Sequence, residues 1–523
     1  MQCVDIIAER KNIELVIFRF YPQEYSANTA RVTLCSRSNM KVLRPERCVA
    51  LDGSPCAACT EDIELEKEMN ELEIRIEKIH IRRRVLRTTM NENHDLLIHK
   101  FPPEIASHIF TQYSSPSVSI NKIYKIRLLY LGAVCQKWRQ LAWATPELWT
   151  SLCISFGGKY DDDQPQLVTE WLERSASLLL TVRYVDRWGL IPGGDKIIVI
   201  LNKHSARWHD MHFEVPAPRL HRFNGSSQEN FLRRLVLHHH HPFTGAQGQP
   251  SDFSPFSMKS KPSPVDLTLT RVGLRCVDIL WNNLTAASVN HIGLDESLEL
   301  IRLAPLLETL TLQAINPSSD VFPIPDTRIV HPHLHSLELR GFKEETVVTG
   351  ILDLLCLPSL EQWIHDLSPL PLDSMITFIG CLSSCLAILK ISIDKINYHQ
   401  VTRLLSNLSS LKVLELRAFD RPPTDDFFSL LCSSAQSPLY LPHLQSLNFL
   451  CAYDFPWLSV PQIFVLSRWR TLRVKVNTQL TYLDCKIAKL FLELVGKGVD
   501  LRVINDWPGP YQYTDLLQAY KER

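Results

Sequence analysis

Hydrophobic residues recur along most of this chain with two different spacings, and the change of spacing divides the chain into zones. Between about 60 and 92 they fall at alternating steps of four and three, the heptad pattern of a helix with one apolar seam. From about 178 onward they recur as Leu-x-x-Leu-x-Leu strings, which are typical of repeated short strands. These patterns predict a mixed α/β chain that begins with a long helix and ends in a repeat array.

The seam of the predicted helix contains seven apolar residues and is interrupted at Arg83. These residues are Leu65, Met69, Leu72, Ile76, Ile79, Leu86 and Met90. Thr60 is a suitable N-terminal cap, and the early acids and late arginines both match the helix dipole. About four heptads are marginal for a stable dimer. Packing on the protein itself and self-association through residues 65–90 both remain open.

Between the two patterns, residues 98–150 contain three short amphipathic segments. Pro102, Pro103 and Glu104 fit the first turn of one helix, residues 126–143 predict a second helix, and residues 145–149 open a third. The apolar faces of the first two are formed by Ile105, Ile109, Phe110, Leu131, Val134, Cys135, Trp138 and Leu141. So small a unit cannot bury all of this surface, and we expect part of it to contact a partner.

In order and spacing, these segments resemble an F-box. The resemblance is carried by Phe-Pro-Pro-Glu-Ile at 101–105, Val-Cys-x-x-Trp-Arg at 134–139 and Thr-Pro-Glu-Leu-Trp at 145–149. The last run is similar to the version common in large fungal families of F-box proteins. Two departures are Phe101, where the family usually has Leu, and a polar insert around 114–125.

The resemblance implies docking onto the Skp adaptor of an SCF-type cullin-RING ubiquitin ligase. Carried over position by position, the adaptor-binding residues would be Pro102, Pro103, Glu104, Ile105, Ile109, Phe110, Leu131, Val134, Cys135, Trp138 and Leu141. Some of these side chains are expected to form the internal core of the unit instead.

Full Leu-x-x-Leu-x-Leu copies begin at Leu307, Leu334, Leu386, Leu411 and Leu444, and weaker copies begin at Trp208, Leu232, Leu274, Leu360 and Trp469. From 307 onward the steps are 27, 26, 26, 25, 33 and 25 residues, a leucine-rich-repeat period. We expect apolar side chains toward the core and polar ones, such as Glu308, Glu338, Lys390 and Glu415, on the concave side. Helices such as 345–355 and 399–408 would form the convex layer, and the Pro-, Ser- and Gly-rich segment 242–264 would form a loop.

Composition restricts the class of protein. With 45% hydrophobic and 21% charged residues, the bulk of the chain can form a folded core. Lys+Arg and Asp+Glu both number 56, which argues against binding to nucleic acid or a membrane by overall charge. No apolar run is long enough for a membrane helix, and the start lacks a signal-peptide pattern. The 14 cysteines are too few for their chain length to form a disulfide scaffold. We therefore expect a cytoplasmic or nuclear protein.

Catalytic, metal and cofactor signatures are weak or missing. The chain has no G-x-x-x-x-G-K-[ST], G-x-G-x-x-G, G-x-S-x-G or H-E-x-x-H. Cys56 and Cys59 form a C-x-x-C without a second close pair, and the runs at 161–163 and 238–241 lack the geometry of calcium or transition-metal sites. We expect neither enzymatic activity nor a metal or cofactor.

The sequence thus predicts an unassigned segment at 1–59, a heptad helix at 60–92, an F-box at 98–150 and an irregular leucine-rich-repeat solenoid at 178–523. We interpret the chain as an adaptor that holds an unidentified protein substrate on its repeats while its F-box binds the ligase. The alternative is a non-catalytic repeat scaffold with no link to a ubiquitin ligase.

Overall fold

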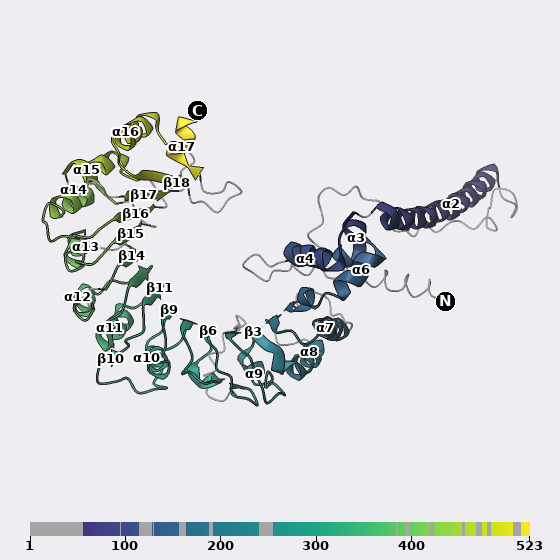
Figure 1. Cartoon of the computed structure of the whole chain (residues 1–523), viewed down its shortest axis with the longest axis horizontal. Helices are drawn as coiled ribbons and strands as arrows, with labels where there is room; N and C mark the ends of the chain where they lie inside the picture. The colour runs from purple at the N-terminus through teal and green to yellow at the C-terminus, as the bar shows by residue number, and fades with distance from the viewer. Residues whose placement is uncertain are drawn as a thin grey trace. The chain divides into compact units, whose positions relative to one another are not determined.

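The computed structural model is a mixed α/β chain with a long N-terminal helix and an extended parallel sheet (Figure 1). It describes residues 56–522 except for 95, 115–127, 129, 156–163, 188–191, 240–254, 383–384, 393–397, 419–422, 452–454, 467–472, 479–482 and 506–513. The predicted segment 1–59 therefore lies almost wholly outside the described residues, as do the acidic run at 161–163 and half of the histidine run.

Two compact units make up the chain, and the division between them falls within β1 (Ser151–Ser155) and α7 (Gln164–Arg174). The helices of the first unit are α2 (Ala57–His94), α3 (Leu96–Lys100), α4 (Pro103–Ser114), α6 (Gln136–Trp143) and the 3-10 helix η3 (Pro146–Trp149). The predicted heptad helix is present and begins three residues before Thr60. None of the described helices combines the length and apolar character required to cross a bilayer.

In the first unit, a small core forms where α4 packs against α6 and η3. One face of α4 buries Ala106 and Phe110, and the Phe110 ring lies 4.8 Å from the ring of Trp138 on α6. Trp149 is almost fully buried, and its Nε1 donates to the carbonyl of Ala142 at 2.8 Å. The three predicted helical segments therefore share one core.

The expected continuous helix over 126–143 is wrong in one respect, because the chain breaks it at Cys135. This residue has extended backbone angles, φ −156° and ψ 171°, and its Sγ accepts from the backbone N–H of Trp138 at 3.4 Å. Arg139 bridges the break, since its Nε donates to the carbonyl of Gly132 at 2.8 Å. Cys135 thus serves as the N-terminal cap of α6 rather than as a residue within a longer helix.

The second unit is built on a parallel ladder of strands with its helices on one side. In sheet order the strands are β2 (Leu180–Val185), β3 (Trp208–Val215), β4 (Arg234–His239), β6 (Asp266–Thr270), β8 (Ala286–Asn290), β9 (Thr309–Gln313), β11 (Ser336–Arg340), β13 (Gln362–Asp366), β14 (Ile388–Ser392), β15 (Val413–Ala418), β16 (Ser446–Cys451), β17 (Arg473–Thr478), β18 (Leu501–Asn505) and β19 (Thr514–Asp515). The pairing of β18 with β19 is antiparallel.

Most helices of this unit lie along the outer side of the curved ladder in Figure 1, and the last one lies at its C-terminal end beside β18. They are α8 (Pro192–Lys203), α9 (Ala217–Leu220), α10 (Leu294–Leu303), α11 (Glu345–Leu354), α12 (Leu372–Gly380), α13 (Tyr398–Leu405), α14 (Asp425–Ser434), α15 (Val460–Leu466), α16 (Cys485–Gly496) and α17 (Leu516–Lys521). The 3-10 turns are η4 (Ser205–Arg207), η5 (Leu274–Cys276) and η6 (Trp457–Ser459). The helices predicted at 345–355 and 399–408 are α11 and α13.

Register aligns the repeated apolar residues across the ladder. Leu310 pairs with Leu337, Leu337 with Trp363, and the same row continues through Leu389 and Leu414. All five side chains are buried, so each repeat shields its neighbour's leucines from water. The predicted strand positions are confirmed at the five full copies.

Three weaker parts of the predicted repeat pattern are wrong. The copy at Leu274 is a 3-10 turn followed by β7 (Val277–Asp278), and the ladder instead uses β6 and β8. The copy at Trp469 is shifted by two residues, because Val474 pairs with Leu447. Within the predicted loop 242–264, Phe256 is fully buried and opens β5 (Phe256–Ser257), which pairs with β7. Another short pair, β10 (Ile329–Val330) with β12 (Leu355–Cys356), joins two repeats away from the main ladder.

A buried carboxylate fixes one connection of the ladder. Asp295, in the first turn of α10, accepts from the backbone N–H groups of Ser319, Val321 and Phe322 at 2.8–3.0 Å. Burial opposes its ionisation, but these hydrogen bonds outweigh burial and lower the pKa of Asp295. Asp295 therefore adds side-chain anchoring to the loop after β9, next to the backbone bridge between Gly293 and Asn316.

One histidine stands within the apolar rows. His365 on β13 is fully buried, and its Nε2 lies 2.8 Å from the carbonyl oxygen of Pro369. Burial lowers the pKa of His365 to about 4, so the ring is neutral at pH 7. Its hydrogen bond ties the end of β13 to the turn that leads into α12.

We predict that His365 makes the second unit sensitive to acid. The unfolded chain binds a proton near pH 6.5 and the folded chain only near pH 4, so this contribution is present above pH 6.5 and falls as the pH drops. Between pH 7.5 and pH 5 the stability should fall by about 2 kcal/mol more in the wild type than in His365→Gln. Urea unfolding of both chains at the two pH values measures this difference. Equal losses would contradict it.

We also predict that Cys135→Ser keeps the cap of α6, because a hydroxyl accepts the same N–H, whereas Cys135→Ala loses it. Hydrogen exchange of the peptide containing Trp138 should be faster in Cys135→Ala and close to wild type in Cys135→Ser. Equal exchange in all three chains would show that the Sγ contact does not protect this amide.

Candidate functional site

The exposed face of α4 is the first candidate docking surface. Ile105, Ile109 and Tyr113 recur every four residues along this helix, and each is at least 40% exposed, with Ile105 at 47% and Ile109 at 40%. The adjoining face carries the buried Ala106 and Phe110. A helix with one apolar face in its own core and another in solvent has the form of a docking element.

The predicted adaptor-binding residues divide into three groups by burial. Those exposed are Pro102, Pro103, Glu104, Ile105, Ile109 and Val134. Those half-buried are Cys135, Trp138 and Leu141. Phe110 and Leu131 are only 1% and 4% exposed and belong to the core of the unit, the role expected for some of the set.

The predicted set left out three exposed apolar residues of the first unit. Phe101, Tyr113 and Tyr130 are each more than 40% exposed. Tyr113 continues the four-residue spacing of Ile105 and Ile109, and Tyr130 lies four residues before Val134. Spacing alone could have identified both tyrosines, but their side of the helix becomes clear only when the buried face is known.

The polar face of the ladder is the second candidate surface. Glu338, Lys390 and Glu415 stand in one register row, with Ile364 between Glu338 and Lys390. Their neighbours toward the core are buried leucines, so these side chains point to the opposite face of the sheet. This outcome agrees with the predicted orientation of the three residues.

Ion pairs cross several strands on this face. Arg417 on β15 contacts Asp366 on β13 at 2.6 Å and Glu415 at 2.8 Å, and Lys390 on β14 reaches Glu415 at 3.7 Å. Burial disfavours the charged guanidinium, yet the hydrogen bond with Glu415 and the charge of Asp366 raise the pKa of Arg417. Two carboxylates, Asp366 and Glu415, thus hold the guanidinium of Arg417 on this face.

A second charged group lies on the early strands of the ladder. Arg234 on β4 contacts Asp266 on β6 at 3.1 Å and Asp210 on β3 at 3.8 Å. His212 on β3 pairs in register with Arg183 on β2. Burial, followed by the charge of Arg183, lowers the pKa of His212 to about 4. The polar face of the sheet therefore carries ion pairs on its early strands as well as on its later ones.

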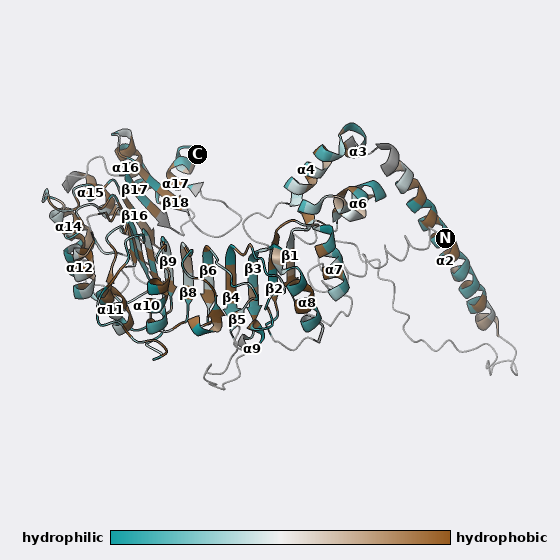
Figure 2. Cartoon of the chain, turned by 60° about the horizontal axis from the view of Figure 1, so that its bottom comes forward, coloured by the Kyte–Doolittle hydropathy of each residue, from teal (hydrophilic) through white to brown (hydrophobic). Residues whose placement is uncertain are grey.

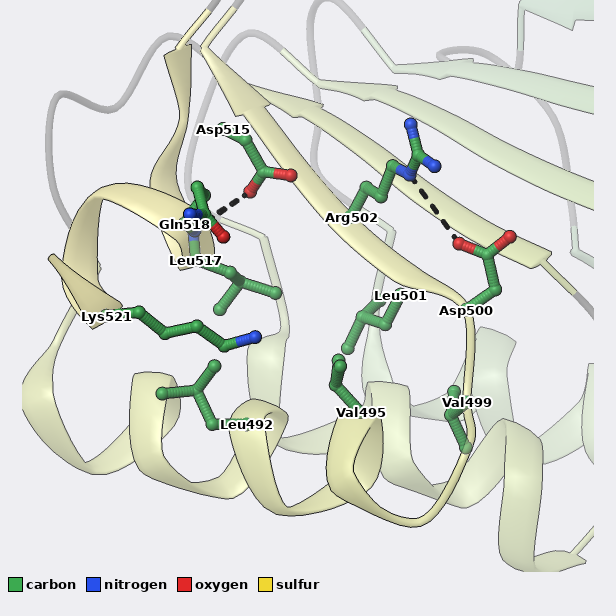
Figure 3. A pocket seen from close by; sticks show the side chains of 10 residues that line it. All are labelled: Leu492, Val495, Val499, Asp500, Leu501, Arg502, Asp515, Leu517, Gln518 and Lys521. Atoms are coloured by element: carbon green, nitrogen blue, oxygen red, sulfur yellow. Dashed lines mark hydrogen bonds and ion pairs between the residues drawn. The ribbon is translucent and has the colours of Figure 1, made fainter.

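A small pocket lies at the C-terminal end of the ladder between α16, β18 and α17 (Figure 3). Its volume is about 260 Å³, slightly below the range of most small-molecule sites. Asp500 pairs with Arg502 at 3.6 Å, and Asp515 caps α17 by accepting from Leu517 N–H at 3.0 Å. These acids thus have structural partners.

Within the described part of the chain, no group of three His, Cys, Asp or Glu residues has the arrangement of a metal site. Cys56 and Cys59 lie at the start of α2, and His238 and His239 lie on β4. Cys35 and Cys48 lie outside the described residues.

Comparisons with known proteins add one assignment. No curated protein matches the chain. A crystal structure of a protein from Bacteroides fragilis, a structural-genomics target, matches with 15% sequence identity and a TM-score of 0.30. The match covers 41% of this chain and 65% of the Bacteroides chain, which is just under two thirds of that chain's length. So low a TM-score supports no argument about fold or function. Residues 98–155 match the model of the F-box-like family, and the chain therefore carries an F-box-like domain in this segment.

Proposed function

We propose that this protein is a substrate-recognition adaptor of an SCF-type cullin-RING ubiquitin ligase. The observation that carries the proposal is the F-box-like domain at 98–155, since domains of this family generally dock onto the Skp adaptor. The exposed apolar face of α4 supports it, because the core formed by the adjoining face of the same helix already holds it in place.

The docking contacts would come from exposed side chains rather than from the whole predicted set. Ile105 and Ile109 would provide the apolar centre, with Pro102, Pro103 and Glu104 at one end of the helix and Tyr113 at the other. Phe110 and Trp138 would act indirectly by fixing the orientation of α4, since their tilted rings pack against each other within the unit. Apolar side chains of this kind commonly supply most of the binding energy at an interface.

The second unit would hold the protein substrate. The repeat period, the continuous rows of buried leucines and the outer layer of helices support an irregular leucine-rich-repeat solenoid at 178–523. In such an array the polar face of the strands forms the binding surface, and the ion pairs around Arg417 would keep its charges in place. A substrate with complementary charges would be selected by this fixed pattern.

The chain itself would perform no bond chemistry, and its contribution to ubiquitin transfer would be proximity. Holding a substrate lysine near the charged conjugating enzyme raises its effective concentration. This role requires no metal or cofactor in the chain, and it would place the protein in the cytoplasm or nucleus. Cullin would be reached through the Skp adaptor.

We predict that Ile105→Glu combined with Ile109→Glu weakens binding of the purified Skp adaptor to the full chain at least tenfold. Both side chains are exposed, so the substitutions should not disturb the core, while two carboxylates would be desolvated at the interface. Binding is measured by biolayer interferometry, and circular dichroism checks the fold.

The matched control is His108→Glu combined with Gln112→Glu, which adds the same charges at exposed polar positions of α4 beside the apolar face. This control should bind within about twofold of wild type. If the wild-type chain fails to capture the adaptor, the alternative of a repeat scaffold outside the ligase is favoured. Wild-type affinity in the folded Ile105 and Ile109 variant would exclude this face of α4.

A further inference from the structure

The long helix α2 leaves its apolar side chains in solvent. It spans 38 residues, and every side chain from 60 to 90 is exposed. The large apolar residues, between 39% and 61% exposed, are Ile63, Leu65, Met69, Leu72, Ile74, Ile76, Ile79, Ile81, Val85, Leu86 and Met90. Figure 2 shows these hydrophobic residues interspersed with polar ones along the helix. A single helix with so much apolar surface needs a partner to be stable in water.

Most of these residues belong to one seam. Leu65, Leu72, Ile79 and Leu86 occupy the d positions of a heptad, and Met69, Ile76, Arg83 and Met90 occupy the a positions. Ile74 and Ile81 lie on the opposite side of the helix, at f positions. The seam is the pattern that a second heptad helix would cover.

Charges beside the seam oppose a parallel, in-register pair of α2 helices. In that arrangement each g residue faces the e residue five positions later on the other copy. The facing pairs would be Glu61 with Glu66, Glu68 with Glu73, Arg75 with His80, and Arg82 with Arg87. Three of the four join like charges, and each occurs twice. Arg83 would also face Arg83 within the apolar seam.

In an antiparallel pair, the two halves of the helix face halves of opposite charge. Residues 57–74 contain seven acids and one lysine, whereas 75–94 contain six arginines or lysines and two glutamates. In the antiparallel pair, the negative first half of one helix lies beside the positive second half of the other.

One antiparallel register covers the whole seam. When Ile76 faces Ile79 of the second copy, Met69 faces Leu86, Leu65 faces Met90, and Arg83 faces Leu72 instead of itself. In that register Glu66 lies near Arg87 and Glu73 near His80, while Arg75 near Arg82 is a like-charged pair that only this arrangement creates.

We propose that α2 forms an antiparallel coiled coil with α2 of a second copy of this chain. The inference rests on the exposed seam and its charge pattern, and it does not depend on the F-box-like domain binding an adaptor. At 1.5 Å per residue, the two ends at His94 would lie about 50 Å apart. The dimer would therefore carry its two F-box-like domains at opposite ends of the coiled coil, where both can bind partners.

The first test is the oligomeric state of the full chain by analytical ultracentrifugation at about 10 µM. The wild type should be a dimer, and Leu72→Glu combined with Ile79→Glu should be a monomer. The matched control, Ile74→Glu combined with Ile81→Glu, changes the f positions and should remain a dimer. A monomeric wild type, or a control that dissociates as fully as the seam variant, would overturn the proposal.

The second test determines the orientation. Chains carrying Met69→Cys are mixed with chains carrying Leu86→Cys, oxidised mildly and mapped by mass spectrometry. An antiparallel pair links residue 69 to residue 86, and a parallel pair links each position to itself, which would overturn the proposal.

Raising salt from about 50 mM to 500 mM should weaken the antiparallel dimer several-fold by screening. A dimer that becomes tighter with salt would indicate like charges in contact and would also contradict the proposal.

Discussion

Parallel register is the constraint on which the second unit depends. Each strand pairs with the next so that the leucine of one repeat lies directly beside the leucine of its neighbour, as in the row from Leu310 through Leu337 to Trp363. A repeat alone cannot bury these side chains, because its strand and helix expose one apolar edge on each side. Stacking the repeats on one another removes both apolar edges of each repeat from water. This requirement explains why insertions, such as the longer step before β16, are placed outside the strands.

The same register determines the chemistry of the polar face. Because alternate residues of a strand point to opposite sides, locking the leucines inward fixes Glu338, Lys390 and Glu415 outward. Arg417 then reaches across β14 to Asp366 on β13, an ion pair between residues 51 positions apart in the chain. A rigid pattern of charge results from packing on the other side of the sheet. The buried, neutral His365 and the ionised Asp295 show that core polar groups are likewise held by hydrogen bonds to neighbouring turns.

The first unit shows two ways of handling apolar surface. In the F-box-like domain, α4 buries Phe110 against Trp138 and leaves Ile105 and Ile109 exposed, so the core orients the face that a partner would contact. In α2 no face is buried, and the residues of the seam are all in solvent. Helix propensity and dipole-matched charges favour such a helix, but they do not cover its seam. This difference supports the docking role proposed for α4 and the self-association proposed for α2.

Sequence periodicity by itself determined the long helix, the strand positions of the five full repeats and the helices at 345–355 and 399–408, because spacing reports directly which side chains share a face. It also identified the F-box-like segment, because aromatic and proline residues there occur in a specific order. It could not separate Phe110 and Leu131, which are buried, from Ile105 and Ile109, which are exposed, since all four are apolar at helical spacing. Nor could it locate the break at Cys135, where a side-chain cap competes with continued helix. The ladder register at Val474, the strand at Phe256 and the contacts of Asp295 and Arg417 were decided only by tertiary structure, because each depends on residues distant in the chain that packing alone brings together.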